Sequence, residues 1–583
     1  MGAFFLCHDA YNFRPALDVF QEMGFSSPKA FRIGGYSLFV YPKMAIQTSN
    51  MIEDDGNLLA TVGTVIYKGL DYSHSLIELF KDLNNECLNS DELFGQYTII
   101  YCRSSDIRII IDPLGSKHVF TDSRYNVFSS HMLPICQSIY GKLHINKTAV
   151  YEKFLTGFIM SPNTIFEEIL QIDGETSRCI NGENSRVIVV HPQGLGEYEP
   201  RRVSSLNACL EEQARQLHKY FAAVEANCKD GVDLGLSGGY DSRLVLACIH
   251  NFTDGKIHLH SHSTENDHKK DLEIAEQMAE YVQIPCHIVK TKRLLHSDNV
   301  EDVLRKSVLY FDGRSSFSIG GCGEVYTAKY RAESTEKTPF TMTGVGGELY
   351  RNVFDIGQKK ISFSHFMKEK VFSSGFKAAI SNVLFEEVSR DILMRAAKRL
   401  AINSDDKKTK EIVHRYYCEI MMPDGQGVAL DAYNQVSYCV APFLEPMVII
   451  KGYEAIPFHG SGGSFEGQLI NHIDSGLASL PSSYGYPINA RPFRAKVKES
   501  LRTRIPATTW EWLSRIVYRK NENQVKPVQV YEDCESLKLA YEYMAQLFPE
   551  INLPLLLKSA EDIRRMQFMA MTLFMVKERI ETK

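Results

Sequence analysis

The sequence predicts a protein of two fold classes in succession, α+β in its N-terminal third and α/β beyond it. Three observations lead to this prediction. Short β-branched or aromatic runs bounded by turn residues fill residues 1 to about 135. Strand-like and helix-like segments alternate after about residue 205, a pattern typical of a parallel sheet with crossover helices. From about residue 360 onward the pattern is mainly helical.

The N-terminal third is mostly β. One helix is expected at Ser73–Asn84, where a serine opens the segment and a polar patch follows it. A stretch rich in Pro, Gly and charge at 191–205 predicts a domain boundary. The predicted strands before that boundary are Ala30–Tyr41, Leu58–Tyr67, Gln96–Cys102, Ile107–Ile111, Val127–Ser130, Thr176–Ile180 and Arg186–Val190.

Beyond the boundary, helices and strands are expected in turn. A long helix candidate, Leu206–Asn227, precedes a short apolar strand. The alternation that follows implies a parallel α/β sheet. Its expected elements are strand Val232–Leu236, helix Arg243–His250, strand Lys256–His262, helix Lys270–Val282 and strand Pro285–Val289.

Composition narrows the class of protein. At roughly 150 residues per domain, 583 residues predict two to four domains. A net charge of −6 argues against a broadly basic nucleic-acid surface. The 13 cysteines are scattered without a CxxC pair, which indicates free thiols in a reducing compartment. No membrane-length apolar run and no signal-peptide pattern occurs, so a cytoplasmic protein without membrane contact is expected.

One segment carries the clearest chemistry. An apolar strand leads into Ser237-Gly238-Gly239-Tyr240-Asp241-Ser242 and then into a helix. Two glycines let the backbone turn tightly and approach a ligand, and the helix start supplies N–H donors. The two serines add hydroxyl groups, and Asp241 adds a carboxylate that can hold Mg²⁺. Together these groups suit a pyrophosphate with magnesium.

A competing interpretation uses the same residues. Gly235-Leu-Ser237-Gly-Gly239 matches the G-x-S-x-G nucleophile elbow of α/β-hydrolases, and both interpretations predict a strand, a turn and a helix. The elbow leaves Asp241 without a role. A Walker A phosphate loop is excluded, because G-x-x-x-x-G-K-[ST] does not occur.

Residues 237–242 resemble the SGGxDS pyrophosphate loop of the N-type ATP pyrophosphatases, in particular the asparagine synthetase-like family. Further motifs of that family follow one another in its order along the chain. They are Gly63-Thr-Val-Ile-Tyr67, Asp112-Pro-Leu-Gly115-Ser-Lys117-His-Val-Phe120, Phe154-Leu-Thr-Gly-Phe158 with Thr164-Ile-Phe166, Gly344-Val-Gly-Gly-Glu348-Leu-Tyr350 and Ala441-Pro-Phe-Leu-Glu445.

The resemblance implies a fold and a division into two domains. Residues 1–195 are expected to form an N-terminal-nucleophile (Ntn) hydrolase-like αββα sandwich, and 200–583 an ATP-pyrophosphatase domain with a helical C-terminal part. The family's glutaminase nucleophile is the cysteine after the initiator Met, where this chain has Gly2. Glycine has no side chain to attack an amide, and Cys7 is best interpreted as a buried small hydrophobe. Glutamine hydrolysis is therefore not expected.

The same resemblance implies roles for individual residues. Asp241 and Glu348 are the expected magnesium ligands. The family has an Asp after G-x-G-x, whereas here Gly347 is followed directly by Glu348, so either the loop is one residue shorter or the Asp has become Glu. The family's lysine after P-F-L-D is missing between residues 452 and 495, and Lys496, with its basic neighbours Arg491, Arg494 and Lys498, could substitute for it. Arg314 lies in a Gly/Ser-rich loop, where an arginine could grip a carboxylate or phosphate, so Arg314 and Lys496 are the candidate catalytic cations beside Asp241 and Glu348. The residues expected around ATP are Leu236, Ser237, Gly238, Gly239, Tyr240, Asp241, Ser242, His262, Thr343 and Gly344.

A zinc site at three alternating histidines is not favoured. His258, His260 and His262 alternate along one strand and share a face. Alternate residues on a straight strand diverge, whereas a tetrahedral zinc site takes ligands from several elements. A polar strand face near the nucleotide is the favoured interpretation.

The sequence therefore predicts an ATP- and Mg²⁺-dependent carbon–nitrogen ligase that forms an acyl-adenylate and then an amide. Relatives without the cysteine, such as β-lactam synthetase and the lasso-peptide cyclases, use an amine already present in the substrate. The expected partner is a small molecule or peptide with a carboxylate and an amine, not nucleic acid. Three alternatives stay open: a non-catalytic nucleotide-binding scaffold, a serine hydrolase and a nucleic-acid-modifying enzyme. The oligomeric state, including a homodimer, is also open.

Overall fold

The protein is described by a computed structural model. The described part of the chain is residues 1–583 without 47–49, 140–142, 175, 184–185, 191–202, 265–268, 292–299, 315–332, 334–337, 355, 357–360, 404–406, 409, 461, 491, 493–496, 498–533, 557–559 and 582–583. Lys496 and most of the predicted boundary at 191–205 lie outside the described residues.

The N-terminal region contains two six-stranded sheets whose paired strands are all antiparallel. The first has the order β12-β10-β11-β1-β3-β2, with β1 Ala3–His8, β2 Lys29–Ile33, β3 Tyr36–Tyr41, β10 Val119–Asp122, β11 Val127–Ser129 and β12 Ile169–Ile172. The second has the order β14-β13-β9-β8-β5-β4, with β4 Met51–Asp54, β5 Asn57–Gly63, β8 Tyr97–Arg103, β9 Asp106–Ile111, β13 Ser177–Asn181 and β14 Val187–Val190.

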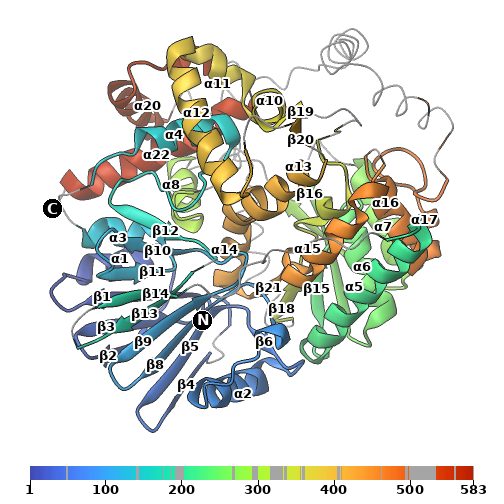
Figure 1. Cartoon of the computed structure of the whole chain (residues 1–583), viewed down its shortest axis with the longest axis horizontal. Helices are drawn as coiled ribbons and strands as arrows, with labels where there is room; N and C mark the ends of the chain where they lie inside the picture. The colour runs from blue at the N-terminus through green and yellow to red at the C-terminus, as the bar shows by residue number, and fades with distance from the viewer. Residues whose placement is uncertain are drawn as a thin grey trace.

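These sheets form the middle of four layers (Figure 1). Alternate residues of a strand face opposite sides, so Phe4 of β1 packs with Leu58 of β5 between the sheets, while Phe5 faces outward. The outer face of the first sheet is covered by α1 (Arg14–Glu22) and α3 (Met132–Ser138). Helix α2 (Tyr72–Asn84) covers the second sheet. The order of layers is helix, sheet, sheet, helix.

The α/β region is built on a five-stranded parallel sheet of order β17-β16-β15-β18-β21. Its strands are β15 Val232–Gly235, β16 Ile257–Thr264, β17 Cys286–Thr291, β18 Phe340–Met342 and β21 Tyr438–Val440. The helices between the first four strands are α6 Asp241–Phe252, α7 Lys269–Tyr281 and α8 Val300–Tyr310, and α5 Leu206–Cys228 precedes β15. The expected α/β class with a parallel sheet is confirmed.

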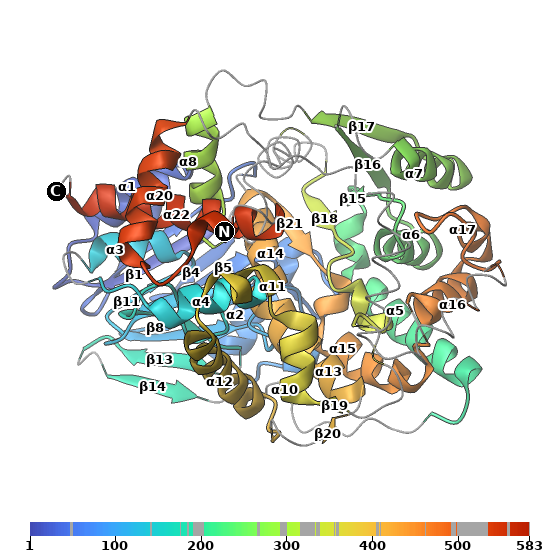
Figure 2. The ribbon, with the colours of Figure 1, turned by 90° about the horizontal axis from the view of Figure 1, so that it is seen from above.

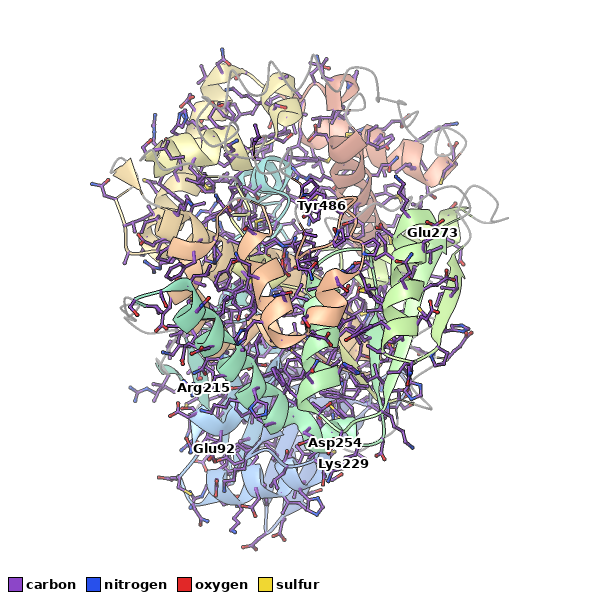
Figure 3. The ribbon with its side chains drawn as sticks, turned by 90° about the vertical axis from the view of Figure 1, so that its right-hand side faces the viewer. Glu92, Arg215, Lys229, Asp254, Glu273 and Tyr486 are labelled. Atoms are coloured by element: carbon purple, nitrogen blue, oxygen red, sulfur yellow. The ribbon has the colours of Figure 1, made fainter. Side chains whose placement is uncertain are left out.

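The strand order determines where a ligand would bind. The chain passes from β15 to β16 and β17 on one side and then returns to β18 and β21 on the other. Such a reversal leaves a crevice beyond the carboxyl ends of the two strands that meet there, which are β15 and β18. Figure 3 shows the two ends of this region: Tyr486 lies at one end, and Asp254 and Lys229, in the turns before β16 and β15, at the other.

The rest of the described chain is mainly helical, as predicted. Helix α22 includes the Met-rich stretch near the C-terminus and packs in a core with α4 and α8. These helices are α4 Lys147–Thr156, α10 Phe363–Phe366, η4 Met367–Val371, α11 Ser374–Ala379, α12 Asn382–Arg399, α13 Lys410–Tyr416, η5 Tyr417–Gln426, α14 Gly427–Val436, η6 Pro442–Leu444, α15 Pro446–Gly452, η7 Tyr453–Phe458, α16 Ser464–Ile473, α17 Ser475–Ser479, α20 Glu535–Leu547, α21 Leu553–Leu556 and α22 Ala560–Glu581. The remaining short elements are η1 Ser90–Glu92, η3 Gly347–Tyr350, β6 Ile66–Tyr67, β7 Leu93–Phe94, β19 Ile361–Ser362 and β20 Lys407–Lys408.

Polar side chains join the sandwich to the helical region. Lys117 and His118 of the loop before β10 both bind Asp431 of α14, at 2.6 Å each. Thr64 binds Asn434 of the same helix at 2.7 Å. All of these side chains are buried, so α14 is fixed between the two regions (Figure 2).

Two predicted strands are wrong in extent, for one physical reason. The run Ala30–Tyr41 is a hairpin, because Gly34 turns the chain with φ of +57°. The run Leu58–Tyr67 is likewise divided at Gly63, where φ is +89° and a Cβ would lie 2.2 Å from the Gln96 carbonyl oxygen. Strand β1, at the centre of the first sheet, was not predicted.

Among the described residues, the cysteines form no disulfide, which agrees with the predicted free thiols. No helix in the described ranges is long and apolar enough to cross a membrane.

Candidate functional site

The predicted pyrophosphate loop lies directly after β15, at the strand reversal. Its two serines hold each other: the Ser237 N–H donates to the Ser242 hydroxyl at 3.2 Å, and the two hydroxyl oxygens lie 3.3 Å apart. The Gly239 N–H donates to the Ser237 hydroxyl at 3.3 Å. Helix α6 begins at Asp241, so its first N–H groups face the same turn. The loop thus gathers hydroxyl groups and helix-start N–H donors at the carboxyl end of β15.

The loop after β18 lies against this turn. A Cβ at Gly344 would come within 2.9 Å of the Asp241 side chain, and one at Gly347 would lie 2.1 Å from the Asp241 Oδ1. Only glycine fits at either position without a shift of Asp241. The motif at 344–348 therefore lies against the pyrophosphate loop, because β15 and β18 are neighbouring strands.

A cluster of charged side chains lies where the two loops meet. The Arg351 guanidinium donates to Asp241 Oδ1 and to Glu466 Oε2. Glu466, on α16, is fully buried. Glu348 accepts a 2.6 Å hydrogen bond from the Tyr417 hydroxyl of η5. Three carboxylates thus gather around one arginine, and we call Asp241, Glu348, Arg351 and Glu466 the carboxylate cluster.

Burial dominates the electrostatics of this cluster. Removal from water raises the pKa of Asp241 to about 6, against the opposing Arg351 charge, and the neighbouring Glu348 charge raises it further. Burial also raises the pKa of Glu466 well above its ordinary value, with the Asp241 charge as a second cause. Burial and mutual repulsion disfavour the simultaneous ionisation of these carboxyl groups, so a cation placed among them would stabilise their ionised forms.

The donor set fits Mg²⁺. This ion takes oxygen ligands and is usually bound by one or two carboxylates together with substrate phosphates. Asp241 and Glu348 could provide the carboxylates beside the predicted pyrophosphate loop. In the described parts of the chain, no group of three or more His, Cys, Asp or Glu side chains has the geometry of an all-protein metal site. A site shared with phosphate is the arrangement that these residues allow.

A segment from the C-terminal region covers the loop. The Ser483 N–H donates to the Gly238 carbonyl at 2.9 Å, and the Tyr484 ring packs edge-on against Tyr240 with centroids 5.0 Å apart. Arg243, in the first turn of α6, is fully buried and donates to the carbonyls of Leu477, Leu480 and Pro481. These bonds hold the segment 477–484 over the loop.

The predicted nucleotide residues on β15 and β16 lie at the carboxyl ends of their strands. The Leu236 N–H donates to the His260 carbonyl at 2.7 Å, and the Leu236 carbonyl accepts from Ser261 at 2.9 Å. His262 follows His260 on β16, with ring centroids 5.2 Å apart. His260 binds Asp233 at 2.9 Å, which accounts for one member of the histidine row as a buried core pair.

One of the predicted catalytic cations, Arg314, does not join the cluster. Arg314 binds Asp431 at 2.9 Å and Asp312 at 3.2 Å, and its described contacts do not include the pyrophosphate loop. Arg314 therefore belongs to the junction with the N-terminal sandwich. Lys496 lies outside the described residues.

Sequence reasoning missed Arg351, Glu466 and Tyr417. One signal was present for Arg351: it follows Glu348 by three residues across the single turn of η3. Glu466 and Tyr417 come from distant helices, and no local pattern marks them.

Gly2, at the position where the resembled family has its nucleophile, is closely packed. A Cβ at Gly2 would lie 2.9 Å from each of three atoms, in Phe25, Pro42 and Gln435. Burial raises the pKa of the Cys7 thiol to about 12, with Asp122 and Asp9 as further causes. A thiol in that state supplies almost no thiolate at neutral pH. The interpretation of Cys7 as a buried hydrophobe agrees with its complete burial.

Comparison with known proteins identifies the segment that carries the loop. Residues 221–329, from within α5 to beyond α8, match the family model described as asparagine synthase. This part of the chain is similar to asparagine synthases. The match includes the Ser237–Ser242 loop and ends before Gly344.

A curated relative supports the same assignment. The chain is 26% identical over 193 residues to the Methanocaldococcus jannaschii protein named "Putative asparagine synthetase (glutamine-hydrolyzing) 2". The match covers 32% of this chain and 36% of that protein, so it spans about a third of the relative's length.

Solved structures give weaker likenesses. The glutamine phosphoribosylpyrophosphate amidotransferase of B. subtilis is 10% identical with a TM-score of 0.24, over 49% of this chain and 65% of that one. The glutamine-dependent NAD⁺ synthetase of Acinetobacter baumannii is 13% identical with a TM-score of 0.19, over 59% of this chain and 65% of that one. Neither score is high enough to assign a fold.

Proposed function

We propose that this protein is an ATP-dependent carbon–nitrogen ligase that activates a substrate carboxylate as an acyl-adenylate. The observation that carries the proposal is the meeting of the Ser237–Ser242 loop with the carboxylate cluster at the strand reversal. Anion donors and carboxylates side by side suit a magnesium-bound pyrophosphate. The match to asparagine synthase over the same loop supports this reaction class.

In the proposed reaction, a carboxylate oxygen of the substrate attacks the α-phosphorus of ATP. The bond to the β,γ-pyrophosphate breaks, and pyrophosphate leaves. An amine then attacks the acyl carbon, the bond to AMP breaks, and an amide forms with release of a proton. Mg²⁺, when bound, would neutralise phosphate charge.

The chain's own residues have distinct roles in this proposal. The Gly239 N–H, the first N–H groups of α6 and the Ser237 and Ser242 hydroxyls bind the pyrophosphate oxygens. Asp241 and Glu348 hold the metal. Arg351 keeps Asp241 in place before the nucleotide binds. The segment at 477–484 excludes water from one side of the loop.

The amine is proposed to come from the substrate and not from glutamine. The packed Gly2 and the Cys7 thiol with a pKa of about 12 support this part of the proposal. The four N-terminal layers are then a degenerate Ntn-like domain that contributes to structure. Its proposed range is 1–195, followed by the ligase domain at 200–583, in a cytoplasmic protein.

The decisive experiment compares Asp241→Asn with Asp254→Asn, a substitution in the exposed turn at the other end of the sheet. Pyrophosphate release is measured across amino acids, peptides and sugar acids, with hydroxylamine present to trap an acyl-adenylate as a hydroxamate. We expect release and trapping in the wild type and in Asp254→Asn, and a loss of at least a thousandfold in Asp241→Asn.

Other outcomes distinguish the alternatives. Full turnover by Asp241→Asn would contradict the proposal. ATP binding without pyrophosphate release for any acid would favour a nucleotide-binding scaffold. Ester hydrolysis without ATP, lost in Ser237→Ala, would favour the hydrolase. The described contacts of the Ser237 hydroxyl are with Ser242 and the Gly239 N–H and include no histidine, which a nucleophile elbow requires. Co-purified RNA would point to a nucleic-acid substrate.

A further inference from the structure

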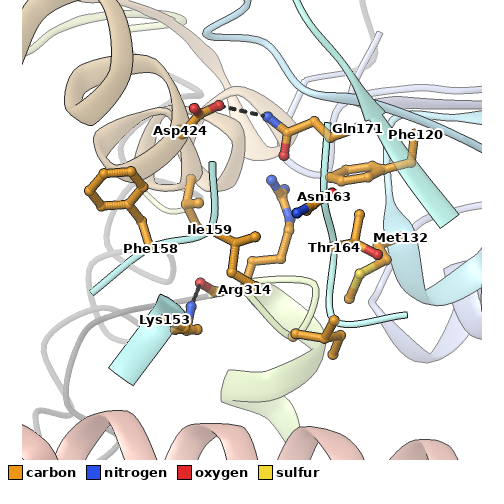
Figure 4. A pocket seen from close by; sticks show the side chains of 13 residues that line it. Phe120, Met132, Lys153, Phe158, Ile159, Asn163, Thr164, Gln171, Arg314 and Asp424 are labelled. Atoms are coloured by element: carbon orange, nitrogen blue, oxygen red, sulfur yellow. Dashed lines mark hydrogen bonds between the residues drawn. The ribbon is translucent and has the colours of Figure 1, made fainter. Parts of the chain in front are cut away.

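A small cavity lies where the N-terminal sandwich meets the helical region (Figure 4). Its apolar lining includes Phe158, Ile159 and Val428. Its polar lining comes from Lys153 of α4, Asn163, Thr164, Gln171, Arg314 and Asp424. None of these residues belongs to the pyrophosphate loop or the carboxylate cluster. The cavity is thus a place separate from the candidate active site.

Lys153 has an unusual environment for a lysine. Its side chain is only 3% exposed, and its described hydrogen bond is to the carbonyl of Arg314. No carboxylate of the described residues lies within ion-pair distance of its Nζ. An ammonium group has three N–H donors, so two of them remain for an occupant of the cavity. A buried charge without a partner is costly, and an anion would remove that cost.

The carboxylates near Lys153 are already paired with arginines. Asp431 binds Arg314, Asp424 binds Arg399 at 2.6 Å and Glu152 binds Arg395 at 2.7 Å. These pairs leave the Lys153 charge as a surplus positive charge. Burial, together with the Arg314 and Arg565 charges, lowers the pKa of Lys153 to about 7. An anion beside the Nζ would stabilise the protonated amine.

Asn163 provides another donor to the cavity. The Asn163 amide has no described hydrogen bond and is half-buried, and Figure 4 shows it beside the Arg314 guanidinium. Other polar groups of the lining are occupied: Gln171 donates to Asp424 at 3.1 Å, and the Thr164 hydroxyl donates to backbone carbonyls. Lys153 and Asn163 therefore offer free donors to one ligand.

The size of the cavity limits the ligand. It measures about 30 Å³ as space open to the centre of a water molecule, where one water needs roughly 10–15 Å³. An anion of three or four heavy atoms is of this size. Two donors match the two oxygens of a carboxylate, and Phe158, Ile159 and Val428 match a short apolar tail.

We propose that this cavity binds a small monocarboxylate of the size of acetate, held by Lys153 and Asn163. The carboxylate oxygens accept from the Lys153 ammonium and the Asn163 amide. The methyl group faces the apolar side chains. This site is independent of the proposed ligase chemistry.

The test is calorimetric titration of the full chain with sodium acetate at pH 7, against sodium chloride at the same ionic strength. Wild type is compared with Lys153→Met and with Lys147→Met, which changes a half-exposed lysine at the start of the same helix. We expect saturable acetate binding in wild type and Lys147→Met, and binding at least tenfold weaker in Lys153→Met. Methionine fills a similar volume without a charge, so the variant is expected to fold.

A second variant tests the other proposed donor, Asn163. Asn163→Leu keeps the volume and removes the amide donor, and it is expected to weaken acetate binding severalfold. Equal acetate affinity in wild type and Lys153→Met would overturn the proposal. So would equal heats from acetate and chloride, because a site without selectivity for carboxylate would be a general anion site. Far-ultraviolet circular dichroism of each variant confirms that a loss of binding is not a loss of fold.

Discussion

At the start of β1, Gly2 lies among Phe25, Pro42 and Gln435 with no room for a side chain, and the nearby Cys7 thiol is held protonated. At the end of β15, glycines instead make room for Asp241, and Arg351 binds two carboxylates, those of Asp241 and Glu466, beside a third. The first region has close packing without reactive groups. The second has buried carboxyl groups whose ionisation is disfavoured until a cation joins them.

This difference shows how packing separates a structural region from a reactive one. Glycine occurs in both, but at Gly2 the neighbouring atoms fill the space, whereas at Gly347 the space is taken by the carboxylate itself. Buried charges lower stability unless they are paired or bind something. A cluster that retains buried charges is therefore a candidate site for binding an ion or ligand. Three substitutions test the difference between the two regions.

Arg351→Met, in the carboxylate cluster, is expected to have the largest effect on the unfolding free energy. It leaves Asp241 and Glu466 buried without a counter-ion, which costs about 3–5 kcal/mol of unfolding free energy. The pKa of Asp241, already about 6, rises further without the guanidinium. Below that pKa the carboxyl is neutral and needs no partner, so the loss should be larger at pH 8 than at pH 5. Urea denaturation at both pH values measures it.

The matched control is Arg215→Met, which removes an exposed pair with Glu212 on α5. That variant should change the unfolding free energy by less than about 1 kcal/mol at either pH. An equally small, pH-independent change in Arg351→Met would mean that the cluster is not the charged site described above.

Gly2→Cys tests the packed end of the comparison. A side chain there overlaps three neighbours, so we expect a loss of about 1–3 kcal/mol of unfolding free energy. Because the cysteine would have no open cleft, glutamine hydrolysis should not appear. Thermal unfolding and ammonia release from glutamine check the two parts, with the exposed position Ala10→Cys as the control. Glutaminase activity in Gly2→Cys would show that the region is only one substitution from function.

Lys153→Met is expected to have the smallest net effect, a gain of about 1–2 kcal/mol in unfolding free energy at pH 7 in acetate-free buffer, because the lost hydrogen bond to the Arg314 carbonyl and the lost packing offset most of the relief from a buried charge. The pKa of Lys153 is about 7 in the folded chain and near 10.5 when unfolded. Between these values the unfolded state binds the extra proton, so wild-type stability rises with pH. The advantage of the variant should therefore be full at and below pH 7 and disappear toward pH 10. Urea denaturation across that range measures it, and a constant difference would contradict the lowered pKa.

Local pattern was sufficient for much of the fold. Helix α2 and strands β9, β13 and β16 lie within a residue or two of their predicted ranges, because each has strong periodicity or clear turn residues at its ends. Strand β1 was missed because its run Phe4–Cys7 has apolar side chains on both faces and no alternation. Both faces are buried, between two sheets and under helices.

The candidate site was predictable in part for the same reason. Ser237, Asp241 and Ser242 lie in one loop, so their spacing along the chain determines their spacing in the site. Arg351 lies 110 residues from the Asp241 that it binds, and only the order of strands β15 and β18 brings them together. The role expected for Arg314 came from its residue type and its Gly/Ser-rich loop, and its partners at the junction could not be foreseen without the fold.

The buried Arg243 has a consequence for the ionic strength at which the loop can act. Its guanidinium binds three carbonyls and, among the described residues, no carboxylate, and its pKa of about 10 keeps it charged at neutral pH. The positive charge therefore stays fixed between the first turn of α6 and the segment 477–484, next to the pyrophosphate loop. Mobile ions do not enter that space, so salt screens it far less than a surface lysine. An anion at the loop meets a field that persists in concentrated salt.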